Sequence, residues 1–189
     1  MKDSKGLVEI ISRILRVKLP AVLIKETEID QIDFKGKDAL NRKRFEEAML
    51  NKGKASILYF QAGYVLRGAD WKKLIFKTVN SADRAAGAAS MLKLRINVSS
   101  EARAAAKAEP YLSELAGNCY IELGDYENAC CAYLKSAKAY IIDFENKIKA
   151  KELKTLAEAL DSTMEINLLE RNPGAKKLYD FLEDKLKES

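Results

Sequence analysis

Residues 116–140 of this chain, AGNCYIELGDYENACCAYLKSAKAY, place small and aromatic side chains where two antiparallel helices have to touch. Gly117 and Tyr120 lie about one helical turn apart, and Gly124 then interrupts the pattern. After the interruption a small or aromatic residue recurs at every fourth position: Ala129, Tyr133 and Ala137. Gly117 and Ala129 are small enough for the two backbones to approach closely, and Gly124 can form the turn. The stretch therefore predicts a helical hairpin.

Together with the preceding residues from Tyr111, this stretch resembles one tetratricopeptide repeat (TPR) in its small residues, its Gly-Asp-Tyr turn and its Ala-x-x-x-Tyr spacing. It differs from the family at the end of the repeat, where Tyr140 and Ile141 continue a helical pattern in place of the usual proline. The resemblance implies a stack of helical hairpins that binds other proteins or peptides and performs no chemistry.

Two further turn signals flank this repeat. Asp70 and Trp71 match Asp125 and Tyr126 in a degenerate second copy, and a third turn follows at residues 172–174. The three turns lie roughly 50 residues apart, which exceeds the roughly 34 residues of an ordinary repeat. The helices of this chain are therefore expected to be longer than the family norm.

Nine glycines and three prolines among 189 residues, with alanine, leucine, lysine and glutamate throughout, favour helices joined by few turns. We therefore expect an all-α protein of a single domain. The resemblance implies that it is built as a TPR-like array of antiparallel helical hairpins with unusually long helices. Its expected parts are an N-terminal helix with a connector (1–36), a degenerate hairpin (37–98), the clear TPR-like hairpin (99–150) and a C-terminal hairpin or cap (151–189).

Local signals within these parts are uneven. An amphipathic helix opens the chain, whereas residues 18–37 fit a strand as well as a helix. A long helix is expected to begin near Lys37 and to be weakened at residues 51–53. Pro110 is expected to kink or restart a helix, and the apolar residues of 144–168 keep helical spacing without interruption.

The chain carries no histidine and none of the common nucleotide-binding or nucleophile motifs. Its cysteines, Cys119, Cys130 and Cys131, show no metal-ligand spacing, and the adjacent pair cannot form an ordinary disulfide. They fit small buried hydrophobic side chains in a reducing cytoplasm. No apolar run is long enough to cross a membrane, and the first residues do not read as a secretion signal. We expect a cytoplasmic protein with no catalytic activity, no metal and no cofactor.

In TPR stacks the first helix of each hairpin lines a concave groove, so the resemblance implies a set of partner-binding positions here: Tyr59, Arg67, Tyr111, Glu114, Asn118 and Glu122. Asn118 follows Gly117 as it does in family members that grip the terminal carboxylate of a peptide. Glu114 stands where those members have a lysine, and its charge would repel such a carboxylate. A hydrogen bond inside the hairpin is the alternative role of Asn118, and the one we favour.

A second hypothesis uses the basic first part of the chain. A cluster of cations near Phe34 and Phe45 could follow a phosphate backbone: Lys35, Lys37, Arg42, Lys43 and Arg44. Acidic residues interrupt that cluster, which is more typical of a solvated helix face. The apolar face of residues 6–18 could lie on an anionic membrane, associate with a second copy or pack on a neighbouring helix, which we favour. A scaffold that binds another protein or peptide is our leading expectation, and a nucleic-acid or membrane-surface accessory protein is the alternative.

Overall fold

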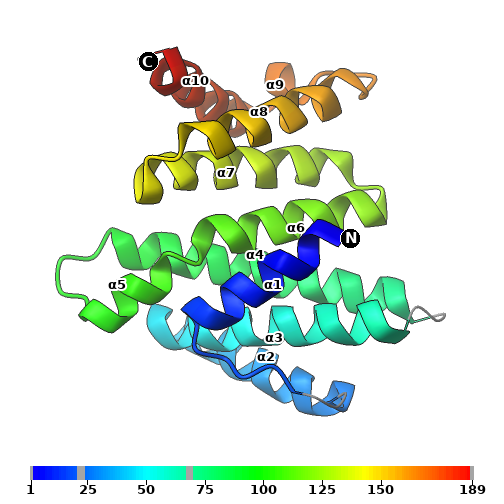
Figure 1. Cartoon of the computed structure of the whole chain (residues 1–189), viewed down its shortest axis with the longest axis vertical. Helices are drawn as coiled ribbons and strands as arrows, with labels where there is room; N and C mark the ends of the chain where they lie inside the picture. The colour runs from blue at the N-terminus through cyan, green and yellow to red at the C-terminus, as the bar shows by residue number, and fades with distance from the viewer. Residues whose placement is uncertain (1, 21–23, 67–69, 188–189) are drawn as a thin grey trace.

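The computed structural model describes residues 2–20, 24–66 and 70–187, and in these ranges it contains helices and no strand (Figure 1). The expectation of an all-α protein is confirmed. The helices are α1 (Lys2–Ile14), α2 (Glu26–Asn41), α3 (Phe45–Leu66), α4 (Trp71–Lys93), α5 (Ser100–Ala106), α6 (Glu109–Leu123), α7 (Tyr126–Phe144), α8 (Lys147–Ser162), α9 (Leu168–Arg171) and α10 (Pro173–Lys187).

Consecutive helices stack along the long axis of the molecule (Figure 1). α3 and α4 form one antiparallel pair and α6 and α7 form another, while α4 packs on α6 and α7 packs on α8. α2 covers α3 near one end of the stack, and α10 packs on α7 and α8 near the other. α3 and α4 span 22 and 23 residues, about twice the length of an average helix.

Both ends of α6 follow the local signals in the sequence. Pro110 lies in the first turn of α6, after α5 has ended, so the expected restart of the helix at this proline is confirmed. Gly124 follows α6 with a φ of 76°, a left-handed conformation that glycine adopts without strain. The Asp125 side chain then caps α7 by accepting a hydrogen bond from the backbone N–H of Asn128 at 3.2 Å. The predicted hairpin is therefore the α6–α7 pair.

Gly117 allows the close approach of α6 and α7, but its neighbour differs from the one expected. A Cβ atom at this position would lie 2.7 Å from Cε1 of Tyr133, so the glycine makes room for the tyrosine ring and not for the Ala129 backbone. Ala129 is itself fully buried, one turn earlier on α7. The prediction that Gly117 lies at the contact between the two helices is correct, but the nearest residue of the facing helix is Tyr133 and not Ala129.

The segment left open between strand and helix, residues 18–37, is helical from Glu26 onward, where α2 begins. The prediction of a helix start near Lys37 is wrong, because the break in the chain comes later, between α2 and α3. There Lys43 has a φ of 56°, which a continuous helix does not accommodate. Glu26 and Glu28 in the first turn of α2 interact favourably with the positive end of the helix dipole.

The predicted weakening at residues 51–53 is also wrong, because α3 runs through them without a break. A Cβ atom at Gly53 would collide with the side chain of Leu15, which follows α1. The glycine therefore serves the contact between two helical segments and does not interrupt its own helix.

Residues 144–168 do not form the uninterrupted helix that their apolar spacing suggests. α7 ends at Phe144, Glu145 has a φ of 52°, and the side chain of Asn146 caps α8 by accepting a hydrogen bond from the backbone N–H of Lys149 at 3.0 Å. The spacing persists across the break because both segments face one apolar cluster, which also contains Leu153.

The amphipathic first helix, α1, lies across α3 and α6 (Figure 1). Its apolar stripe is buried in the largest apolar cluster of the protein: Leu7, Val8, Ile11 and Leu15. A membrane, a second copy and a neighbouring helix were the three alternatives for this face, and it packs on neighbouring helices. The stripe is therefore covered by the chain itself and is not open to a membrane or to a second copy.

Candidate functional site

The positions that the resemblance assigns to a partner-binding groove do not form one open surface. Arg67 lies outside the described residues. The others belong to α3 and α6, the two helices that α1 crosses. Whether a side chain of this set is exposed therefore depends on α1, α2, α7 and α8 as much as on its own helix.

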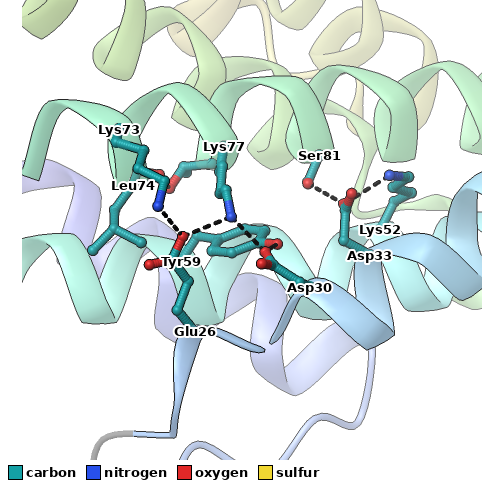
Figure 2. A network of polar contacts seen from close by, with 10 residues as sticks. Glu26, Asp30, Asp33, Lys52, Tyr59, Lys73, Leu74, Lys77 and Ser81 are labelled. Carbon is teal, nitrogen blue, oxygen red and sulfur yellow. Dashed lines mark hydrogen bonds and ion pairs between the residues drawn. The ribbon is translucent and has the colours of Figure 1, made fainter. Parts of the chain in front are cut away.

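Tyr59 is 2% exposed and lies in the contact between α2, α3 and α4 (Figure 2). Its hydroxyl donates a hydrogen bond of 2.5 Å to Oδ1 of Asp30, and Nζ of Lys77 lies 5.3 Å from the centroid of its ring. Burial and the hydrogen bond to Asp30 raise the pKa of Tyr59. The expectation that Tyr59 faces an open groove is wrong, because α2 covers it.

Glu114 and Tyr111 face α7, the second helix of their own hairpin, and Glu114 also reaches α8. The carboxylate of Glu114 is buried, accepts a hydrogen bond of 3.0 Å from the hydroxyl of Tyr140, and pairs with Nζ of Lys149 at 2.8 Å. The ring of the half-buried Tyr111 packs edge-on against Tyr140 and Phe144. Glu114 is thus a buried carboxylate that holds helices together. The expectation that it lies exposed in a groove is wrong, because α7 and α8 bury it.

Asn118 makes the hydrogen bond within the hairpin that we favoured. Its Oδ1 accepts from the hydroxyl of Tyr133 at 2.6 Å, and its Nδ2 donates to Oγ of Ser4 in α1 at 3.0 Å. Its amide therefore bridges α7 and α1. Glu122 is exposed near the end of α6, away from these contacts.

A ladder of ion pairs joins α2 to α3 and α4 (Figure 2), and its members are far apart in the sequence. Glu26 pairs with Lys73 at 2.8 Å and with Lys77 at 2.7 Å, and Asp30 pairs with Lys77 at 2.5 Å. Hydrogen bonds from Lys73 and Lys77 lower the pKa of Glu26. Each carboxylate of the ladder therefore has a cation on a neighbouring helix, which fixes the position of α2 along the stack.

Lys52 is the most buried cation of this ladder, with a side chain only 1% exposed. Its Nζ lies 2.7 Å from Oδ1 of Asp33, which also accepts a hydrogen bond from the Ser81 hydroxyl. Gly36 of α2 lies against the aliphatic stem of Lys52, since a Cβ there would be 2.8 Å from its Cγ. Burial lowers the pKa of Lys52, and the hydrogen bond to Asp33 opposes that shift.

The basic cluster proposed for nucleic acid lies at the end of α2 and in the turn to α3. Arg42 and Arg44 both contact the carboxylate of Asp38, at 3.0 and 3.1 Å, and Arg44 also pairs with Glu47 at 2.7 Å. Lys35, Lys37 and Lys43 are exposed. Because the two arginines are paired locally, the cluster is less available to phosphates than its composition suggests.

An open groove lies between α4 and α7, with α6 as its base. Its volume is about 540 Å³, and its walls include Gly87 and Ser90 of α4, Leu94 directly after α4, and Lys135, Lys138 and Ile142 of α7. Leu94 is 77% exposed and Ile142 is 58% exposed, so two large apolar side chains stand in solvent at one end. Lys93 at this end pairs with Glu109 and Asp143, which ties α4 to α6 and α7.

The cysteines are free and mostly buried: Cys119 and Cys130 are buried and Cys131 is half-buried. Burial raises the pKa of the Cys130 thiol to about 12, and it raises the pKa of the other two thiols as well. No group of His, Cys, Asp or Glu within the described ranges has a geometry that could hold a metal ion. Burial and raised pKa values disfavour the thiolate form, so these thiols lack the environment of a reactive cysteine, and Cys131 is the most accessible of the three.

Thiol labelling should follow this difference in burial. At about pH 8 we expect Cys131 to react first, with Cys119 and Cys130 reacting at least about 100-fold more slowly than in the unfolded chain, because they require an opening of the structure. Mass spectrometry of iodoacetamide-treated protein measures the order. Equal labelling of all three thiols in the folded protein would contradict this arrangement.

No helix within the described residues has the length and apolar character needed to cross a membrane. No family model, curated protein or solved structure matches the chain.

Proposed function

We propose that this chain is a non-catalytic interaction scaffold related to TPR proteins, and that it holds a partner peptide or helix in the groove between α4 and α7. The observation that carries the proposal is the exposure of Leu94 and Ile142 beside an open groove of about 540 Å³. Apolar side chains that line a concave surface typically mark a site of interaction. The helix-on-helix stack and the three free, mostly buried thiols fit a binding role in a reducing cytoplasm.

The dimensions of the groove suit a short helix. Its α4 wall extends from Asp83 to Leu94, which corresponds to about 16 Å along the helix axis, or about three turns. Small side chains occupy the middle of this wall at Ala86, Gly87 and Ser90, so a partner backbone can approach α4 closely. An amphipathic helix with apolar side chains toward Leu94 is the partner that fits these walls.

The α7 wall adds a preference for charge. Lys135 is exposed on this wall, and Lys138 lies near it with its Nζ 5.4 Å from the centroid of the Phe181 ring. Lys93 is already paired with Glu109 and Asp143. Acidic side chains on the partner would therefore meet Lys135 and Lys138, which favours association with an acidic amphipathic segment.

A bulky residue placed in the groove tests the proposal. The exposed Gly87 has no neighbouring atom within 4 Å of an added Cβ, so Gly87→Trp should fold normally and fill the groove. We expect affinity purification from native extract to lose its partner at least about tenfold with this variant. Lys72→Trp, at an exposed position of α4 outside the groove, is the matched control and should keep the partner.

The same experiment separates the scaffold from the nucleic-acid alternative. Charge reversal at Lys35, Arg42 and Lys43 should leave the partner bound in a scaffold. Retention of binding by Gly87→Trp, together with loss on charge reversal and recovery of nucleic acid in the purified material, would replace the proposal by the alternative.

A further inference from the structure

We call each level at which a side chain of α2 contacts one of α4 a rung of the ladder. The three rungs advance in step along both helices, from Glu26 with Lys73 and Lys77, to Asp30 with Lys77, to Asp33 with Ser81 (Figure 2). Each of them contains an acid of α2, whereas the fourth rung contains none. The next residue of the α2 series is Lys37, and the next on α4 is Arg84. Since both helices have advanced by about one turn, this rung presents two cations where the first two pair an acid with a lysine.

Lys37 and Arg84 face one hollow, of about 450 Å³, that runs along the seam between α2 and α4. Both side chains are exposed. The ion pairs between described residues that line this hollow join Lys52 to Asp33 and Lys77 to Asp30, and none of them involves Lys37 or Arg84. Lys52 lines the same hollow. Burial is the main cause that lowers its pKa, and the positive charges of Arg84 and Lys37 also lower it. At this end of the hollow Lys52 pairs with Asp33, so Lys37 and Arg84 are two further cations without a carboxylate partner.

Two exposed phenyl rings border the same hollow. Phe34 of α2 is 68% exposed and Phe76 of α4 is 57% exposed. Phe34 lies one turn before Lys37 on α2, so an apolar ring and an unpaired cation stand next to each other on the surface. Exposed aromatic side chains grouped around a concavity are typical of protein-binding surfaces.

We propose that the hollow between α2 and α4 docks a segment of a partner protein that places a single carboxylate between Lys37 and Arg84 and an apolar side chain against Phe34 and Phe76. The carboxylate completes the fourth rung, as Asp30 completes the rung with Lys77. This surface is separate from the groove between α4 and α7, so it adds a second contact to the scaffold.

The charges along the seam favour an isolated carboxylate over a nucleic acid. Successive rungs are about 5–6 Å apart. A duplex carries a phosphate on each strand for about every 3.4 Å of its helix axis, so phosphates next to the one at Lys37 and Arg84 would meet the carboxylates of Asp33 and Asp30. A peptide with one acidic residue beside an apolar one places its negative charge at the fourth rung alone.

A short peptide tests the docking surface on the full-length protein. The probe is the blocked pentapeptide Gly-Leu-Glu-Phe-Gly, compared with its Gln counterpart and with inorganic phosphate, and binding is followed by amide chemical shifts of labelled protein. We expect saturable shifts along α2 and α4 near Lys37 and Arg84, and an affinity about tenfold lower for the Gln peptide and for Arg84→Gln. Lys72→Gln, on the same helix outside the hollow, should bind like the wild type. Shifts elsewhere, equal binding of the two peptides, or stronger binding of phosphate would overturn the proposal.

Charge reversal at the rung gives a second, opposite readout. Lys37→Glu should lose the peptide and at the same time raise the melting temperature by about 1–3 °C, because it places an acid opposite Arg84. A residue kept only for stability would show a lower melting temperature instead, and that result would overturn the proposal. The Gly87→Trp variant should still bind the pentapeptide, so the outcome at this surface is independent of the outcome at the α4–α7 groove.

Discussion

Asp33→Ala is expected to lower the free energy of unfolding by about 3–5 kcal/mol, because it leaves the ammonium group of Lys52 buried without its counter-charge. The side chain of Lys52 is 1% exposed and cannot reach water without displacing α2, whose Gly36 lies against its stem. Urea denaturation at about pH 7, followed by circular dichroism, measures the loss.

Lys52→Met is the matched control, since it removes the buried charge and keeps a side chain of similar length. Asp33 is 28% exposed and keeps its hydrogen bond from Ser81, so it tolerates the loss of the lysine better than Lys52 tolerates the loss of Asp33. We expect Lys52→Met to change the unfolding free energy by less than about 1 kcal/mol, in either direction. A larger loss for Lys52→Met than for Asp33→Ala would contradict this account.

The pH dependence of Asp33→Ala has a definite sign. Burial lowers the pKa of Lys52 in the folded protein, whereas a lysine in the unfolded chain has a pKa of about 10.4. Between these two pKa values the unfolded chain binds more protons than the folded protein does. Stability therefore rises with pH in the window between the folded and the unfolded pKa. Removal of Asp33 takes away the interaction that opposed the shift, which widens the window. The deficit of the variant relative to the wild type should shrink from about pH 7 to about pH 10.

The ladder that contains Lys52 was not predicted from the sequence, because its paired residues lie far apart in the chain. Asp30 and Lys77 are 47 residues apart, and a local pattern does not specify which turn of α2 lies beside which turn of α4. A signal was nevertheless present: acids recur at helical spacing along residues 26–33, and cations recur along residues 73–84. Two helix faces of opposite charge favour each other, but only the fold shows that they are adjacent.

The features that could be predicted correctly from the sequence are local ones, which depend on a single residue and its neighbours in the chain. Gly124 forms a left-handed turn and Pro110 begins a helix, and each conformation follows from the residue itself. The exposure of the partner-binding positions expected from the resemblance depends instead on neighbouring helices, because α2 covers Tyr59 and α7 and α8 enclose Glu114. A pattern within one helix does not show which other helices cover it, so the exposure expected for Tyr59 and Glu114 rested on their own helices alone.

Gly117→Leu is expected to lower the free energy of unfolding by about 1–3 kcal/mol, because the added side chain enters space held by Tyr133. A Cβ at this position would lie 2.7 Å from Cε1 and 2.9 Å from Cδ1 of that ring. The ring cannot swing away easily, since Tyr133 is buried and its hydroxyl donates a 2.6 Å hydrogen bond to Asn118. Thermal denaturation should show a fall of about 2–4 °C for each kcal/mol lost.

Gly87→Leu is the matched control on α4, because an added Cβ there meets no atom within 4 Å. It should stabilise the protein by about 0.5–1 kcal/mol, since leucine favours a helix more than glycine does. The cause of the loss at Gly117 can then be assigned with Tyr133→Ala, which vacates the ring. If the collision is with Tyr133, the double variant Gly117→Leu, Tyr133→Ala should lose less stability than the sum of the two single variants, by at least about 0.5 kcal/mol. Strict additivity would show that Gly117 is required by a contact other than the one with Tyr133.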